Sequence, residues 1–187
     1  MVRNFVPTPL PADVKERILA NAQRAPSAGF SQGWAFLVLD GPEQTRGYWE
    51  TVGPERPAAF QWPGLFNAPL LVVCWSNQAA YVDRYAEPDK GWTDRDPARW
   101  SAPFWDIDTG MAAMLMLLTA VDAGLGALFF RVPPAKMQRL RTRYGIPEGL
   151  HPIGTLAIGY PAPTDRPSPS LQRGRRAAAE VVHRGHW

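Results

Sequence analysis

Two observations predict an α+β fold for this chain. Segments whose apolar residues recur at helical spacing are interspersed with short runs rich in β-branched and aromatic residues, so helices and strands mix along the sequence. The chain has 187 residues, which is enough for one compact domain with a sizeable core. We therefore predict a single domain over residues 1–187, and the sequence has no internal repeat.

The first half of the chain predicts a helix and two strands, with a short helix between the strands. Apolar residues recur at helical spacing over residues 12–25, and Pro11 suits a first helical turn. Residues 34–39 and 70–75 are short β-rich runs bounded by Gly, Pro and Asp, which predicts two buried strands. We expect residues 43–52 to form the short helix between them.

The second half is dominated by a segment, residues 107–123, that is apolar on nearly every helical face. Asp108 or Thr109 is placed to cap its start, and Gly124 is placed to end it. A helix that is apolar all round must be buried all round. The elements predicted after it are a strand, a helix and a strand, at residues 125–130, 135–144 and 154–160.

Two long segments fall outside this pattern. Residues 77–103 carry four aromatic side chains among many charges and prolines, which is typical of a functional lid or insertion facing a substrate. Residues 161–187 form a tail that is first proline-rich and then ends in Val181, Val182 and Trp187. Such a tail needs a docking surface to become ordered, and a neighbouring subunit is the natural one. The tail and the apolar helix together favour a homodimer.

The composition limits the possible locations and partners. Charged residues make up 20% of the chain and apolar residues 45%, which is typical of a folded protein. The longest apolar stretch, residues 111–121, is shorter than the roughly 18 residues that cross a bilayer, and prolines interrupt the N-terminal region where a signal peptide needs an apolar run. We therefore expect a cytoplasmic protein that binds no membrane. The single cysteine, Cys74, is expected to be a buried strand residue.

The net charge of +3 is small, and the excess arginines gather near the C-terminus. They are Arg173, Arg175, Arg176 and Arg184. This pattern favours a local anion site over a nucleic-acid-binding face, although a solvated charged tail is the plain alternative. His183 and His186 have no third ligand at a suitable spacing, so we expect no metal site.

Residues 24–36 read Arg-Ala-Pro-Ser-Ala-Gly-Phe-Ser-Gln-Gly-Trp-Ala-Phe, which resembles the flavin-binding signature R-x-P-S-x-x-N-x-Q-P-W-x-F of the nitroreductase family. Further matches follow in the order of that family. They are Gly-Leu-Gly at 124–126, Ile-Pro-Glu-Gly at 146–149, Ile-Gly-Tyr-Pro at 158–161, Arg-Arg at 175–176, Glu-Val-Val-His at 180–183 and the final Trp187. Their order and spacing make the combined resemblance strong.

The resemblance implies a nitroreductase-like fold, with a central, mostly antiparallel sheet flanked by helices. It also implies flavin mononucleotide (FMN) at the interface of a symmetric homodimer, with each C-terminal tail exchanged onto the partner. NADPH or NADH would deliver a hydride to flavin N5, and a small planar acceptor, such as a nitroarene, quinone or enone, would then occupy the same space in a ping-pong cycle. We expect no catalytic side chain, because the cofactor carries the electron chemistry.

The resemblance also assigns residues to this site. The turn matching the signature would lie along the ribityl and pyrimidine side of FMN, the backbone after the Gly-Leu strand would run beside the isoalloxazine, with the Arg131 amide on N5, and tail arginines would bind the phosphate. The expected cofactor residues are Arg3, Arg24, Pro26, Ser27, Ala28, Gln32, Phe129, Phe130, Arg131, Val132, Arg173 and Arg175. The expected acceptor contacts are Phe30, Trp92, Trp100 and Phe104, of which Phe104 suits a core position equally well.

Some positions depart from the family pattern. The upstream Arg and Ser of its N-terminal motif are missing, with only Arg3, Asn4 and Phe5 matching, and Phe30 stands where the family has Asn. The stretch A-P-S-x-G-F-x-Q-x-W also resembles the enzymes that make 5,6-dimethylbenzimidazole by fragmenting reduced flavin with oxygen. That reaction and a non-enzymatic flavin-binding protein therefore stay open as alternatives.

Overall fold

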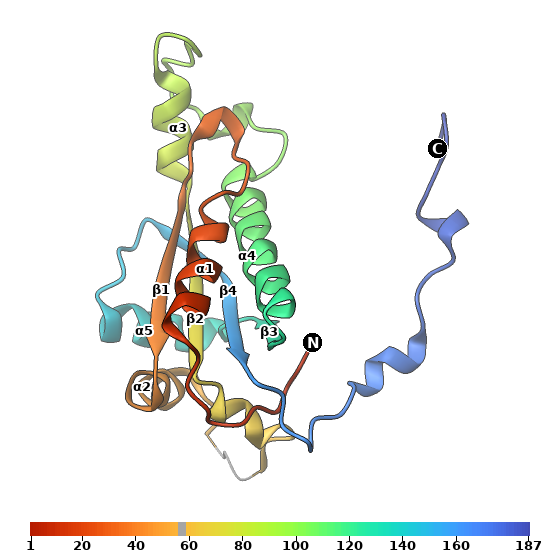
Figure 1. Ribbon diagram of the computed structural model, residues 1–187. Coiled ribbons are helices and arrows are strands. Elements are labelled where there is room, and N and C mark those ends of the chain that lie inside the picture. Colours follow the sequence, from red (N-terminus) through yellow and green to blue (C-terminus); the bar gives the residue numbers. More distant parts are fainter. Residues whose placement is uncertain (56–58) are drawn as a thin grey trace.

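The computed structural model describes residues 1–55 and 59–187 (Figure 1). Within these residues, helices and strands are mixed along the chain, as the α+β prediction expects. The helices are α1 (Ala12–Ala22), α2 (Pro42–Val52), α3 (Gln78–Ala86), α4 (Phe104–Asp122) and α5 (Met137–Tyr144). The strands are β1 (Trp34–Asp40), β2 (Leu70–Asn77), β3 (Gly126–Phe130) and β4 (Leu150–Gly159).

The four strands of the described residues form one sheet in the order β1-β2-β4-β3, and every neighbouring pair is antiparallel. This confirms the predicted antiparallel sheet. β2 and β4 lie in the middle, and seven of the eight residues of β2 are buried. A strand covered on both faces reads as a continuous apolar run, which is why residues 70–75 stood out in the sequence.

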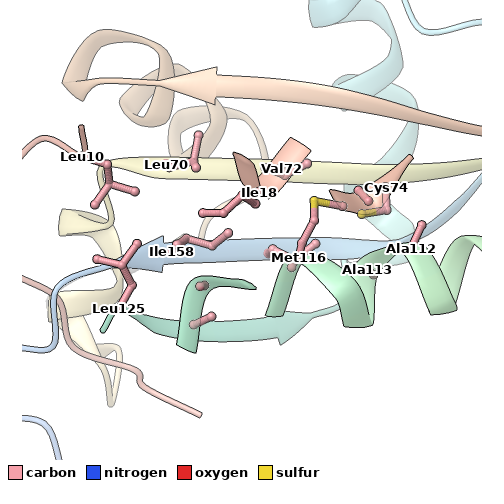
Figure 2. Close-up of a cluster of buried hydrophobic side chains, with 14 of the residues drawn as sticks. Leu10, Ile18, Leu70, Val72, Cys74, Ala112, Ala113, Met116, Leu125 and Ile158 are labelled. Atoms are coloured by element: carbon pink, nitrogen blue, oxygen red, sulfur yellow. The ribbon is translucent and has the colours of Figure 1, made fainter. Parts of the chain in front are cut away.

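Helices cover both faces of the sheet (Figure 1). α1 and α4 pack on one face, where Ile18 and Met116 meet Val72 and Ile158 in a fully buried cluster (Figure 2). α2 and α5 pack on the opposite face. The side chains of β2 point alternately into the two cores. The fold therefore has three layers, with the sheet between two layers of helices.

Cys74 lies in the first of these cores, as predicted (Figure 2). Burial raises the pKa of its thiol to about 12. The thiol is therefore protonated at neutral pH, and because the thiolate is the reactive form, Cys74 is a packing residue in the folded protein.

Several predicted boundaries are corrected by the structure. α1 ends at Ala22, three residues early, because the amides of Arg24 and Ala25 bond to the carbonyls three residues before them and tighten the last turn. β4 begins at residue 150 and not 154, since its first residues continue to pair with β2 beyond a bulge at Cys74/Trp75. α5 begins at Met137, after a short 3₁₀ turn at Pro134–Lys136.

The start of α4 was also predicted wrongly. The helix begins at Phe104, so Asp108 and Thr109 lie inside it and are buried, and neither caps its start. The hydroxyl of Thr109 donates to the carbonyl oxygen of Trp105 at 2.7 Å, in the turn before it. The Asp108 carboxylate bonds outside the helix, as described below.

One face of α4 is exposed within the single chain, so its burial all round stays a prediction that requires a partner. The exposed side chains lie at i, i+4, i+7, i+11 and i+14, and their exposed fractions run from 37% to 65%. They are Ile107, Met111, Met114, Leu118 and Val121, and we call them the α4 stripe. By length and composition alone, this helix of 19 residues is apolar enough to span a membrane, a property that core helices share. Its other face packs on the sheet and α1.

The tail leaves the sheet after β4 and runs away from the body of the protein (Figure 1). From Pro169 onward every residue is exposed, and Trp187 has an exposed fraction of 97%. Its regular structure is limited to short 3₁₀ turns at Pro169–Arg173 and Ala178–Glu180. Docking of the tail onto a partner therefore stays a prediction.

The packing of α4 gives a stability prediction. Met116→Ala should lower the free energy of unfolding by about 2–5 kcal/mol, because it leaves a cavity in a core where Met116 is fully buried. Met116→Leu is the control, since it keeps the volume and should cost less than about 1.5 kcal/mol. Urea unfolding measures both, and equal losses from the two variants would show that Met116 does not fill a packed core.

Candidate cofactor site

The turn that matches the signature, residues 27–32, links α1 to β1 and has an unusual backbone. Gly29, Phe30 and Gln32 have φ values of +61°, +57° and +51°, in the left-handed region. For residues with a side chain this region costs roughly 1–2 kcal/mol each. The Ser27 hydroxyl oxygen accepts from the Gln32 amide at 3.0 Å and closes the turn. Backbone strain of this kind is concentrated at functional sites.

Side chains from α3 and α4 hold the turn from outside. The Asp108 carboxylate accepts from the Ala28 amide at 2.9 Å and from the Tyr81 hydroxyl at 2.8 Å, both through Oδ2. Nε of Arg84 donates to the Gly29 carbonyl at 2.9 Å. Burial, and then the bond to Asp108, raises the pKa of Tyr81 well above its ordinary value of 10, so its hydroxyl stays protonated and donates.

Glycine is required where the turn meets α3. A Cβ at Gly29 would lie 2.6 Å from the Tyr85 ring, and its positive φ also favours glycine. A Cβ at Gly33 would lie 2.5 Å from the Tyr81 ring. The turn and α3 are therefore in direct contact, and a larger residue at either position would push them apart.

The segment predicted as a lid, residues 77–103, folds around its own aromatic side chains. The Trp100 ring lies 4.4 Å from Tyr85, 5.4 Å from Trp92 and 5.6 Å from Phe104, measured between centroids. Such pairs stabilise the segment by about 0.5–1.5 kcal/mol each beyond the buried area. The Trp92, Trp100 and Phe104 rings, which were expected to face an acceptor, therefore pack largely against one another and Tyr85. Phe30, by contrast, is 75% exposed at the tip of the turn.

A second group of predicted residues gathers at the β3 edge of the sheet. The Val2 amide donates to the Ala127 carbonyl at 3.0 Å, which places the N-terminal segment carrying Arg3 beside β3. The Arg3 guanidinium lies over the Trp62 ring, 5.6 Å from its centroid, and Arg131 is exposed just after β3. Arg3 therefore lies near the start of β3, and Phe129–Val132 lie at and just after the end of the same strand.

A cavity of about 300 Å³ opens in this region, next to Arg131. Its lining is mainly apolar and includes Phe60, Phe130 and Trp49, with Lys136 also among the lining residues. The Trp49 and Phe130 rings are stacked, 5.6 Å apart and 12° from parallel. A planar, largely apolar molecule suits such a lining.

The predicted cofactor residues fall into three groups that one chain does not bring together. Across the sheet, Phe130 pairs with Thr155, Thr155 with Val73, and Val73 with Leu37. At about 4.8 Å between neighbouring strands, Phe130 therefore lies roughly 14 Å from Leu37. The turn lies beyond the start of β1, further along the sheet. The turn group is Arg24, Pro26, Ser27, Ala28 and Gln32, the edge group is Arg3 and Phe129 to Val132, and the tail group is the exposed Arg173 and Arg175.

Sequence reasoning missed two residues of the turn's surroundings. Asp108 was interpreted as a helix cap, although a carboxylate inside an otherwise apolar helix is itself a signal, because it needs a buried partner. Arg84 gave no signal among the many charges of its segment. Among residues 1–55 and 59–187, the structure has no cluster of three or more His, Cys, Asp or Glu side chains that could hold a metal ion.

The chain is similar to known proteins of one family. A model described as the nitroreductase family matches residues 1–160. The chain is 29% identical over 176 residues to an Archaeoglobus fulgidus protein provisionally named NADH dehydrogenase/NAD(P)H nitroreductase, covering 92% of this chain and 84% of that protein. It is 27% identical to an iodotyrosine deiodinase of Haliscomenobacter hydrossis, covering 97% of this chain and 84% of that protein.

The fold is shared with solved structures. One of them is a provisionally assigned nitroreductase from Exiguobacterium sibiricum 255-15, crystallised in complex with FMN. It superposes with a TM-score of 0.74 at 18% sequence identity, and the match covers 97% of this chain and 91% of that one. The antiparallel sheet with its flanking helices is therefore the arrangement of these proteins.

The strained turn gives a second prediction. Phe30→Asn should raise the free energy of unfolding by up to about 1 kcal/mol, because Asn adopts the left-handed region more readily and little packing is lost from an exposed ring. Phe30→Ala removes the ring without favouring that region and should not stabilise the protein. Urea unfolding compares the three proteins; a larger loss for Phe30→Asn than for Phe30→Ala would contradict the strain.

Proposed function

This chain belongs to the nitroreductase family, and we propose that it is an FMN-dependent oxidoreductase that uses NADH or NADPH to reduce a small planar acceptor. The overall reaction consumes the reduced nicotinamide, one proton and the acceptor, and it yields the oxidised nicotinamide and the acceptor reduced by two electrons. Bound FMN would supply the redox carrier that takes the hydride and passes the electrons on. Relatives named NAD(P)H nitroreductase and NADPH-dependent oxidoreductase support this class of reaction.

The observation that carries the proposal is the turn of residues 27–32. It matches the family signature and is held in a strained conformation that the local sequence alone does not favour. Ser27, with its hydroxyl, and the neighbouring backbone groups offer donors and acceptors to the polar part of a flavin. We assign Arg24, Pro26, Ala28 and Gln32 to the same contact.

The β3 edge suits the rest of the cofactor. Arginine side chains bind phosphate groups through several donors, and Arg3 lies in this region. We assign the backbone of Phe129 to Val132 to the isoalloxazine, with the Arg131 amide toward N5. The tail arginines Arg173 and Arg175 are assigned to the phosphate once the tail is docked. The aromatic-lined cavity beside Arg131 supports a planar acceptor.

A homodimer would complete this site. The α4 stripe leaves five large apolar side chains open to solvent, and an exposed apolar surface of this kind marks an association surface. We propose that a second copy covers the stripe, that the turn of one protomer meets the β3 edge of the other, and that the tails are exchanged. Each cofactor site would then be formed by residues from both protomers.

The function is tested on purified protein reconstituted with FMN and desalted, then mixed anaerobically with NADPH or NADH. Flavin absorbance should be retained and should bleach quickly, and oxidised acceptor should restore it. Retained flavin that does not bleach would reject the reductase in favour of a flavin-binding protein or a flavin-fragmenting enzyme. Release of 5,6-dimethylbenzimidazole from reduced flavin in oxygen would identify the latter.

The homodimer is tested with Met114→Lys combined with Leu118→Lys, which places two charges in the proposed interface. The wild-type protein should have the mass of a dimer by light scattering, and this variant should shift to monomer and bind FMN more weakly. Gln138→Lys with Thr142→Lys adds the same charge to an exposed face of α5 and should leave the dimer intact. A monomeric wild-type protein would contradict the arrangement.

A further inference from the structure

We propose that Asp108 and Arg84 are positioning residues, which hold the turn of residues 27–32 in the conformation that contacts FMN. The segment of residues 77–103, predicted as a lid, would then serve as the frame of this turn. This inference rests on the proposed function, because it concerns how the same cofactor site is formed. It gives a role to two charged residues that the cofactor itself need not touch.

Asp108 is the buried acid of α4, with an exposed fraction of 1%. A carboxylate removed from water costs several kcal/mol unless hydrogen bonds compensate for the lost hydration. The compensating hydrogen bonds come from outside its helix, from the Ala28 amide at 2.9 Å and the Tyr81 hydroxyl at 2.8 Å. One oxygen thus fixes the turn and α3 relative to α4.

Arg84 holds the next residue of the turn, Gly29. Its Nε donates to the Gly29 carbonyl at 2.9 Å, and its two terminal nitrogens bond Asp89 at 2.7 Å each. This paired contact fixes the plane of the guanidinium, and it raises the pKa of Arg84 while lowering that of Asp89. The guanidinium, which is charged in any arginine at neutral pH, is therefore held in a fixed orientation toward the turn.

The turn needs this external support because its backbone is strained. Phe30 and Gln32 both have positive φ, which costs roughly 1–2 kcal/mol of conformational energy each. The hydrogen bonds from Asp108 and Arg84 are made to the two residues just before Phe30. Without them the turn would relax toward ordinary backbone angles. The backbone groups offered to FMN would then be displaced, and flavin affinity would fall even though no contact residue had changed.

The aromatic cluster makes the frame rigid. The Tyr81 ring packs edge-on against Trp100 at 5.9 Å, and Tyr85, which blocks any side chain at Gly29, packs against Trp100 and Trp92. Residues far along the segment are therefore connected to the turn by packed rings. In this arrangement Trp92 and Trp100 pack within the segment and support the turn from behind Tyr81 and Tyr85.

The test compares Asp108→Val and Arg84→Met with wild-type protein by hydrogen exchange of the peptides covering residues 26–33, measured without flavin, and by the dissociation constant for FMN. Both variants should increase exchange in these peptides at least tenfold and raise the dissociation constant by a similar factor. Exchange in β2 and β4 should stay at the wild-type rate. Asp108→Asn keeps an acceptor oxygen and should restore most of both properties.

Asp122→Asn removes a charge from the exposed end of the same helix and is the matched control, with no change expected. Arg84 lies near the surface, so Arg84→Met should fold even if Asp108→Val does not. Unchanged exchange at residues 26–33 in Arg84→Met would overturn the proposal. So would an equal rise throughout the chain, which is the sign of a merely structural role. If wild-type protein binds no FMN, the proposed function fails, whereas the exchange measurement still decides whether these residues hold the turn.

Discussion

The pairing of β2 with β4 in the middle of the sheet is the interaction on which the remaining structure depends. Their ladder runs from Leu70 opposite Ile158 to Asn77 opposite Leu150, and it supplies side chains to the cores on both faces. A slip of one residue would exchange the two faces and expose each core to the wrong helices. β1 and β3 attach to the outer sides of this pair, so its register also sets where the turn and the β3 edge lie.

Much of the fold could be predicted because apolar patterns are local. Residues 70–75 and 34–39 are bounded by turn-forming residues, and the strands β2 and β1 follow these limits to within two residues. Two of the boundaries that failed depend on tertiary contacts. β4 begins early because β2 is there to pair with it, and α4 begins early because Phe104 and Trp105 pack against the aromatic segment.

The site was predictable only where its residues are consecutive. The turn was found from one stretch of sequence, but its support comes from Arg84 and Asp108, more than fifty residues away. No periodicity reports such a contact. The apolar character of residues 107–123 shows that the helix must be covered, and composition alone cannot distinguish cover by the same chain from cover by a partner. The structure separates the two faces.

The burial of Cys74 has a practical consequence. The chain has one cysteine, and its thiol is fully buried and protonated at neutral pH. A cysteine introduced at the surface, for example in the exposed tail or beside the α4 stripe, would therefore be the one reactive thiol of the native protein. Spectroscopic labels could be attached at chosen positions without first removing the natural residue, so distances between tail and body could be followed in an otherwise unaltered core.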